Sequence, residues 1–99
     1  MLDFTELEPK ILEAAQLMEM LSQPVRLRLM CILLEGEQSV HHLADSTNLS
    51  QPAMSHHLKK LRDADLVKTR REGQTIYYSL KGNEVAQVLA VLHKLFCAH

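Results

Sequence analysis

A change of hydrophobic periodicity in the second half of the chain constrains the fold more than any other feature. Over residues 50–61 the apolar residues recur at helical spacing and form a single stripe. Residues 66–71 and 75–80 instead alternate between apolar and polar, as half-buried strands do. Because Glu72-Gly73-Gln74 separates the two alternating runs, the sequence predicts a polar helix followed by a β-hairpin.

Four more helices are expected around this unit. Proline is tolerated in a first helical turn, and Pro9 and Pro24 both precede apolar residues at helical spacing. Gly36 and Asn48 suit the backbone conformation in which helices end. With the polar helix included, the expected helices run from residue 8 to 21, from 22 to about 34, from after 39 to about 47, from 50 to 61, and from 84 to about 97.

The order of four helices, a hairpin and a final helix predicts a mainly α protein with a β-hairpin wing. A short helix, a tight turn and a capped polar helix form a helix-turn-helix, and a hairpin directly after it makes a winged helix-turn-helix. A chain of 99 residues supports one core, so we expect residues 1–99 to form a single domain.

Several classes of function are excluded on composition and motifs. The sequence has no nucleophile–base set, no glycine-rich phosphate loop and no cofactor motif, so it predicts neither an enzyme nor a bound cofactor. It contains no apolar run of about 18 residues, so no membrane association is expected. The first residues lack the basic and apolar regions of a secretory signal, and we therefore expect a cytoplasmic protein.

The distribution of charge favours a nucleic acid as partner, although the net charge is −1. Residues 1–48 balance to −5, residues 49–81 balance to +4, and the remaining residues balance to zero. A basic middle segment allows a small protein to meet phosphates without a high overall pI. The alternative is a protein-binding helical domain with a solvated basic edge, and a steep salt dependence of DNA affinity would separate the two.

The polar helix and the hairpin supply the candidate DNA-binding residues. In helix-turn-helix proteins the start of the recognition helix meets base edges in the major groove, and Gln51 is able to pair with adenine through two hydrogen bonds. Lys59, Lys60 and Arg62 lie further along, where phosphates are expected. Arg70 and Arg71 fall on opposite faces of their strand, so one of them faces outward. The candidates are Ser50, Gln51, Pro52, Ala53, Ser55, His56, Lys59, Lys60, Arg62, Arg70, Arg71 and Gln74.

One copy of the domain offers one recognition helix, so a homodimer is expected. Two copies would place two recognition helices about 34 Å apart and read a pseudo-palindromic operator in double-stranded DNA. The first and last predicted helices are rich in Leu, Val, Met and Ala and are available to form the dimer interface.

Three segments of the chain resemble the ArsR/SmtB-type bacterial regulators. Residues 21–29 resemble the start of that family's second helix, residues 49–61 its recognition helix and residues 70–80 its wing. The resemblance covers roughly residues 9–97. It implies a homodimeric winged-helix repressor that an inducer releases from DNA.

The metal-binding motifs of that family are absent from their usual places. Ser39 and His41 stand where many members carry metal-binding thiolates on the third helix. The last helix has no Asp, and His93 and His99 do not have the spacing of the zinc ligands of other members. The resemblance therefore argues against metal sensing at either place.

The two cysteines resemble those of a dithiol subfamily of these regulators. Cys31 lies in the second predicted helix and Cys97 at the end of the last. The resemblance implies that they sense reactive sulfur species or oxidants by forming a disulfide or polysulfide bridge. His93, four residues before Cys97, lies on the same helix face and is a possible modulator of that thiol.

Other interpretations of the cysteines remain open at this point. Free cysteine is often a small buried hydrophobe, which is the plain alternative for Cys31, and His93 could be an ordinary dimer-interface residue. Cys31, Cys97 and His93, with His99 as a possible fourth ligand, could instead form a metal site in a metal-responsive repressor. A regulator that acts by anti-repression, with no thiol inducer, is a further alternative.

Overall fold

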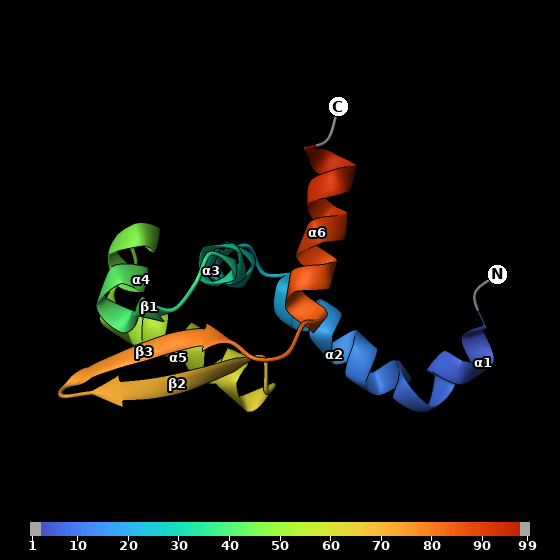
Figure 1. Ribbon diagram of the computed structural model, residues 1–99, viewed down its shortest axis with the longest axis horizontal. Coiled ribbons are helices and arrows are strands. Elements are labelled where there is room, and N and C mark those ends of the chain that lie inside the picture. The colour runs from blue at the N-terminus through green and yellow to red at the C-terminus, as the bar shows by residue number, and fades with distance from the viewer. Residues whose placement is uncertain (1–2, 98–99) are drawn as a thin grey trace.

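The computed structural model describes residues 3–97 and shows a winged helix-turn-helix (Figure 1). The predicted helices and hairpin are present, and a short N-terminal helix and a third strand accompany them. Within the described part of the chain, no helix is long and apolar enough to span a membrane. The elements are α1 (Phe4–Leu7), the 3-10 turn η1 (Glu8–Lys10), α2 (Ile11–Leu21), α3 (Pro24–Leu34), β1 (Gln38–Ser39), α4 (Val40–Thr47), α5 (Gln51–Asp63), β2 (Val67–Glu72), β3 (Thr75–Leu80) and α6 (Glu84–Phe96).

The helix-turn-helix pair α4–α5 forms as predicted, because its caps are encoded locally. The Ser39 hydroxyl accepts a hydrogen bond from the His42 amide at 3.0 Å, and the Ser50 hydroxyl accepts one from the Ala53 amide at 3.3 Å. Both bonds satisfy amides that the first turn of a helix leaves unpaired. Asn48, at φ 56°, ends α4 in the left-handed conformation that asparagine tolerates.

The start of the chain differs from the expectation. Pro9 has no amide hydrogen to donate, and the predicted first helix, residues 8–21, is divided into η1, which contains Pro9, and α2. Helix α1 precedes this segment and was not predicted. The cap of α3 is Gln23 rather than Ser22. The Gln23 side chain accepts from the Arg26 amide at 2.9 Å, while the Ser22 hydroxyl donates to the Glu19 carbonyl at 2.7 Å and so ends α2.

The sheet has three antiparallel strands in the order β1-β3-β2. The two-residue strand β1 was not predicted, since two residues carry no periodicity. Glu72 pairs with Thr75, so the wing turn consists of Gly73 and Gln74 alone and is one residue shorter than expected. Gly73 has φ +60°, which the first central position of a tight hairpin turn requires.

The core lies where α3, α5, α6 and the base of the wing meet. The predicted stripe of α5 is confirmed, because Met54, Leu58 and Leu61 are each no more than 1% exposed. With this face held in the core, the polar face of α5 is turned to solvent. The buried apolar residues are Leu21, Leu29, Met30, Leu33, Leu43, Ala44, Met54, Leu58, Leu61, Val67, Tyr78, Val85 and Leu89.

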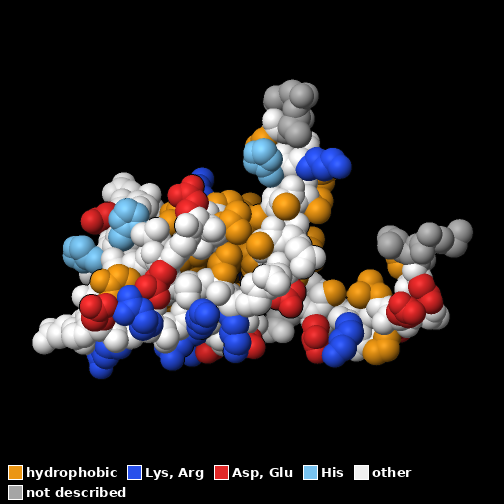
Figure 2. All heavy atoms as spheres, in the orientation of Figure 1, with side chains coloured by type: hydrophobic (Ala, Val, Ile, Leu, Met, Phe, Trp, Pro, Cys, Tyr) orange, Lys and Arg blue, Asp and Glu red, His pale blue; other side chains and the backbone are white. Residues whose placement is uncertain are grey.

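The apolar residues of α2 and of the end of α6 contribute little to this core. Leu21 is the one buried residue of α2, whereas Leu12 and Met18 are 82% and 60% exposed. On α6, Leu95 and Phe96 are 69% and 75% exposed. Figure 1 shows α1 and α2 running away from the wing and α6 standing out from the body, and Figure 2 shows hydrophobic side chains along both. Apolar surface of this extent marks a contact site.

Candidate nucleic-acid interface and cysteine pair

The exposed face of α5 carries the residues expected to read DNA. Three buried apolar side chains fix the rotation of this helix, so the opposite face projects outward over its whole length. The exposed residues are Ser50, Gln51, Pro52, Ser55, His56, Lys59, Lys60 and Arg62, and Ala53 is half-buried. The sequence-predicted surface is therefore accessible to a duplex.

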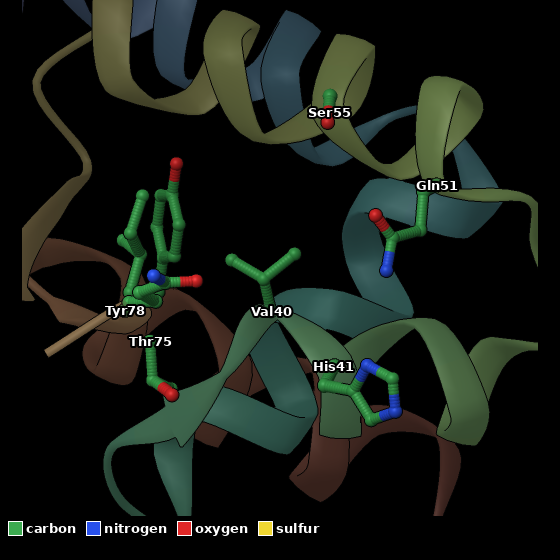
Figure 3. A pocket seen from close by; sticks show the side chains of 8 residues that line it. Val40, His41, Gln51, Ser55, Thr75 and Tyr78 are labelled. Atoms are coloured by element: carbon green, nitrogen blue, oxygen red, sulfur yellow. The ribbon is translucent and has the colours of Figure 1, made fainter.

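A groove of about 380 Å³ lies between this helix and the wing (Figure 3). Gln51 and Ser55 enter it from α5, and Gln74 comes from the wing turn, so the groove brings three of the predicted residues together. His41 and Thr75 line it as well and were not among the candidates. His41 is the second residue of α4, and only its place near the start of the first helix of the pair could have indicated it.

Basic side chains gather along the hairpin and the neighbouring end of α5 (Figure 2). Lys59 forms an ion pair with Asp63 at 2.9 Å, and both side chains are well exposed. Exposed pairs of this kind contribute little free energy and exchange readily for a phosphate. Lys60 and Arg62 form no ion pair within residues 3–97.

The two wing arginines lie on opposite faces of β2, as the alternation predicts. Arg70 is opposite Tyr77 on the outer face, and its guanidinium pairs with Glu37 and Glu72, both at 2.8 Å. Arg71 is opposite Ile76 and lies on the same face of β2 as the buried Val67. Its side chain is exposed and forms no ion pair in the described part of the chain.

His57 is the half-buried member of the adjacent histidine pair on α5. Its Nδ1 is buried and has no hydrogen-bond partner among residues 3–97. Burial lowers the pKa of His57, and the positive charge of Arg26 and the neighbouring His56 and Lys60 lower it further. The ring is therefore held neutral in the folded protein at neutral pH.

This histidine makes stability depend on pH. Below the ordinary histidine pKa of about 6.5, His57 is protonated in the unfolded chain but stays neutral in the folded protein. The free energy of unfolding should therefore fall as the pH drops below about 6.5, and His57 should cause no further loss once the pH is below its lowered pKa in the folded protein. Above the ordinary pKa, His57 is neutral in both states and should contribute no pH dependence. Urea titrations between pH 5 and 8 test this. His57→Gln should flatten the profile relative to wild type, whereas His56→Gln, at the exposed neighbour, should not; equal profiles for both variants would contradict the assignment.

Both cysteines are free and exposed. Cys31 is not a core residue, because Leu29, Met30 and Leu33 occupy the buried side of α3. The alternative of a buried hydrophobe is therefore wrong for Cys31 within the described chain. Cys97 follows the last turn of α6, where its amide donates to the His93 carbonyl at 2.8 Å. Helix α6 packs against α3, so Cys31 lies on one of two contacting helices and Cys97 directly follows the other.

The structure assembles no metal centre from these residues. Among residues 3–97, no group of three or more His, Cys, Asp or Glu side chains is arranged to hold a metal ion. The set of Cys31, Cys97 and His93 is thus not brought together within the described chain, and His99 lies outside the described residues.

Comparison with known proteins identifies the family. The profile described as "Bacterial regulatory protein, arsR family" matches residues 23–69. The chain is 38% identical to the transcriptional activator HlyU of Vibrio cholerae, over 97% of this chain and 89% of HlyU. It superposes on the transcriptional repressor BigR from Xylella fastidiosa with a TM-score of 0.91, 39% identity, and coverage of 99% and 100% of the two chains.

A third comparison concerns assembly. The homodimeric winged helix-turn-helix DNA-binding domain from Mycobacterium bovis superposes with a TM-score of 0.79 at 29% identity, over 90% of this chain and 83% of that one. HlyU and BigR are named a transcriptional activator and a transcriptional repressor, which confirms the prediction that the chain is a transcriptional regulator. The sequence, the fold and the exposed recognition helix agree: the chain belongs to the ArsR family of bacterial regulatory proteins.

Proposed function

We propose that residues 1–99 form one winged-helix domain that acts in the cytoplasm as a homodimeric, thiol-controlled repressor. In its reduced form it binds a pseudo-palindromic operator, and a disulfide or polysulfide bridge between Cys31 and Cys97 lowers its DNA affinity. The observation that carries the proposal is that Cys31 is exposed on α3 and Cys97 is exposed directly after α6, and that these two helices contact each other.

The DNA side of the proposal is supported by the α5–wing groove. Gln51 and Ser55 offer an amide and a hydroxyl able to bond base edges. Lys60, Arg62 and Arg71, which form no ion pair with another residue of the 3–97 range, offer cations for phosphates. The remaining α5 candidates, Pro52, Ala53, His56 and Lys59, line the same helix face.

Homodimerisation is supported by the uncovered apolar faces of α2 and α6. Leu12, Met18, Val91, Leu95 and Phe96 are each more than half exposed in the single chain. A second copy would cover them, and the Mycobacterium bovis relative is described as homodimeric. Because α6 takes part in this interface, a shift of α6 changes the spacing of the two recognition helices.

The sensing chemistry needs only the two thiols and an electrophilic sulfur donor. One thiolate attacks the outer sulfur of an organic persulfide and releases a thiol, leaving a protein persulfide. The second thiolate attacks the inner sulfur and expels hydrogen sulfide, so that both cysteines are oxidised to a disulfide. For a trisulfide, the protein persulfide first attacks the outer sulfur of a second organic persulfide and releases a second thiol; the second thiolate then attacks the middle sulfur of the resulting chain and expels hydrogen sulfide. Peroxide gives the plain disulfide with release of two waters. His93 lies one turn before Cys97, and we propose that it modulates that thiol.

The Cys31–Cys97 bridge lowers DNA affinity by changing the position of α6. Linking α3 to the end of α6 pulls on the part of α6 that carries the exposed interface residues. A coupling free energy of about 1–3 kcal/mol, or about 5- to 150-fold in affinity, is typical between two such sites. At the upper end of that range, most of the operator DNA is released.

A second candidate is regulation by anti-repression, in which the bound protein displaces another DNA-binding protein. It is favoured by one observation, that the relative from Vibrio cholerae is named a transcriptional activator. This candidate uses the same DNA surface and differs only in the direction of the transcriptional response.

The experiment uses a duplex selected by the reduced protein from a random library, so no operator needs to be known. Fluorescence anisotropy then gives Kd across a range of salt concentrations, before and after treatment with an organic persulfide. We expect log affinity to fall steeply with log salt, by about 0.9 for each phosphate neutralised. Persulfide treatment should raise Kd by at least about fivefold, reversibly with a reducing agent. Failure to select any duplex would contradict DNA binding, and an unchanged Kd would contradict thiol control alone.

A further inference from the structure

Arg70 is the most heavily engaged side chain on the wing. Its Nε and one terminal nitrogen donate to both oxygens of Glu37 at 2.8–3.3 Å, and the other terminal nitrogen donates to Glu72 at 2.8 Å. The guanidinium carbon also lies 4.6 Å from the centroid of the Tyr77 ring. A planar guanidinium that is hydrogen-bonded to carboxylates on two sides and stacked on an aromatic ring is held in one orientation.

The contact with Glu37 spans the full width of the sheet. Arg70 lies on the edge strand β2, Tyr77 opposite it on the central strand β3, and Ser39 opposite Tyr77 on β1. Glu37 immediately precedes β1, 33 residues before Arg70 in sequence. The arginine therefore reaches over Tyr77 across two inter-strand spacings, or roughly 9–10 Å.

This bridge joins the wing to the helix-turn-helix. Ser39 pairs with Tyr77 in the sheet and also caps α4 through its hydroxyl. Glu37 and Ser39 both belong to the short segment that leads into α4. The ion pair from Arg70 to that segment therefore fixes the angle between the wing and α4, and with it the groove that Gln51 and Gln74 both line.

The charges of the cluster oppose a phosphate contact by Arg70. Two carboxylates surround one guanidinium, so the cluster carries a net charge of −1. The hydrogen bonds from Arg70 lower the pKa of Glu37, and those from Glu37 and Glu72 raise the pKa of Arg70, so both groups stay ionised at neutral pH. Isolated exposed ion pairs contribute little, but a bidentate pair within a network is the exception.

We infer that Glu37 and Arg70 are positioning residues for DNA binding: the Glu37–Arg70–Tyr77 bridge holds the wing against the segment entering α4, and Arg71 on the opposite face supplies the phosphate contact. The inference rests on the DNA-binding function. Glu37 then supports DNA binding although it is acidic. Arg70 supports the wing and does not contact a phosphate.

The test compares Glu37→Gln, Arg70→Gln, Arg70→Lys and Arg71→Gln on the duplex selected by wild type. The bridge predicts that Glu37→Gln and Arg70→Gln each weaken binding by about 2- to 10-fold, the cost of ordering freed side chains on binding. Neither should change the salt slope, and the double variant should be no weaker than either single one. Arg70→Lys should not rescue binding, because an ammonium cannot form the fork.

Arg71→Gln is the matched variant at the neighbouring position. It should lower the magnitude of the salt slope by about 0.9 for each wing. Hydrogen exchange supplies a readout independent of DNA. Wing amides of residues 68–75 should exchange faster in Glu37→Gln and Arg70→Gln, while those of α3 keep wild-type protection.

The opposite pattern would overturn the inference. If Arg70 instead contacts a phosphate and its ion pair with Glu37 competes with that contact, Glu37→Gln should strengthen DNA binding and Arg70→Gln should lower the magnitude of the salt slope. Unchanged wing exchange in both variants would equally contradict the bridge. Failure of wild type to select any duplex would instead count against DNA binding itself, so the two failures are distinguishable.

Discussion

Leu95→Glu is expected to convert the protein into a folded monomer that binds the selected duplex at least about 100-fold more weakly, since two linked half-sites gain about 10²–10⁴ in avidity. Leu95 is 69% exposed and lies beside Val91 on the apolar side of α6 that faces away from the core. Burying Leu against a second copy contributes about 1.5–3 kcal/mol, and glutamate both removes that gain and introduces a charge to be desolvated.

The matched control is Ala90→Glu, which introduces the same charge at an exposed position of the same helix, about 140° around its axis from Leu95. Sedimentation equilibrium gives the oligomeric state of both variants, and circular dichroism checks that each retains its helices. Ala90→Glu should remain dimeric with unchanged Kd. A dimeric Leu95→Glu variant with wild-type affinity would show that α6 does not form the interface.

Cys31→Ser and Cys97→Ser should each leave the reduced protein with wild-type DNA affinity and abolish the loss of affinity that persulfide causes. Serine nearly preserves the size of the side chain but cannot form a bridge, and both positions are exposed, so the cost to folding is small. The difference between treated wild type and treated variants should reach the full coupling, about 5- to 150-fold in Kd.

Cys31→Ala separates the loss of the thiol from any effect of the new hydroxyl, and should behave like Cys31→Ser. Anisotropy titrations of reduced and treated protein supply the measurement. Weak DNA binding by both reduced Cys31 variants would indicate a structural role for this cysteine. A retained response in either single variant would show that the pair is not the sensor.

The helix-turn-helix could be predicted from the sequence because its signals are local. The cap residues Ser39 and Ser50, the left-handed Asn48 and the apolar stripe of α5 each act within a few residues. The same holds for the hairpin, whose alternation and glycine fix its strands. Only the turn length was wrong, because register depends on pairing across the strands rather than on composition.

Other features depend on contacts that no local pattern contains. The strand β1 exists because Gln38 and Ser39 meet Tyr78 and Tyr77 on a strand far along the chain. The alternation predicts that Arg70 and Arg71 face opposite ways, but the partnership of Arg70 with Glu37 is a tertiary contact. The apolar residues of α2 have core-like spacing, and only the structure shows that the single chain leaves them exposed.

The most direct test of thiol control is a tandem mass spectrum of reduced, metal-free protein treated with an organic persulfide and, separately, with peroxide. The account predicts a cross-linked peptide that joins Cys31 to Cys97, with added sulfur only after persulfide. A plain disulfide with both reagents would keep the dithiol sensor but make it a general redox sensor. Absence of any Cys31–Cys97 cross-link with either reagent would contradict the proposed mechanism.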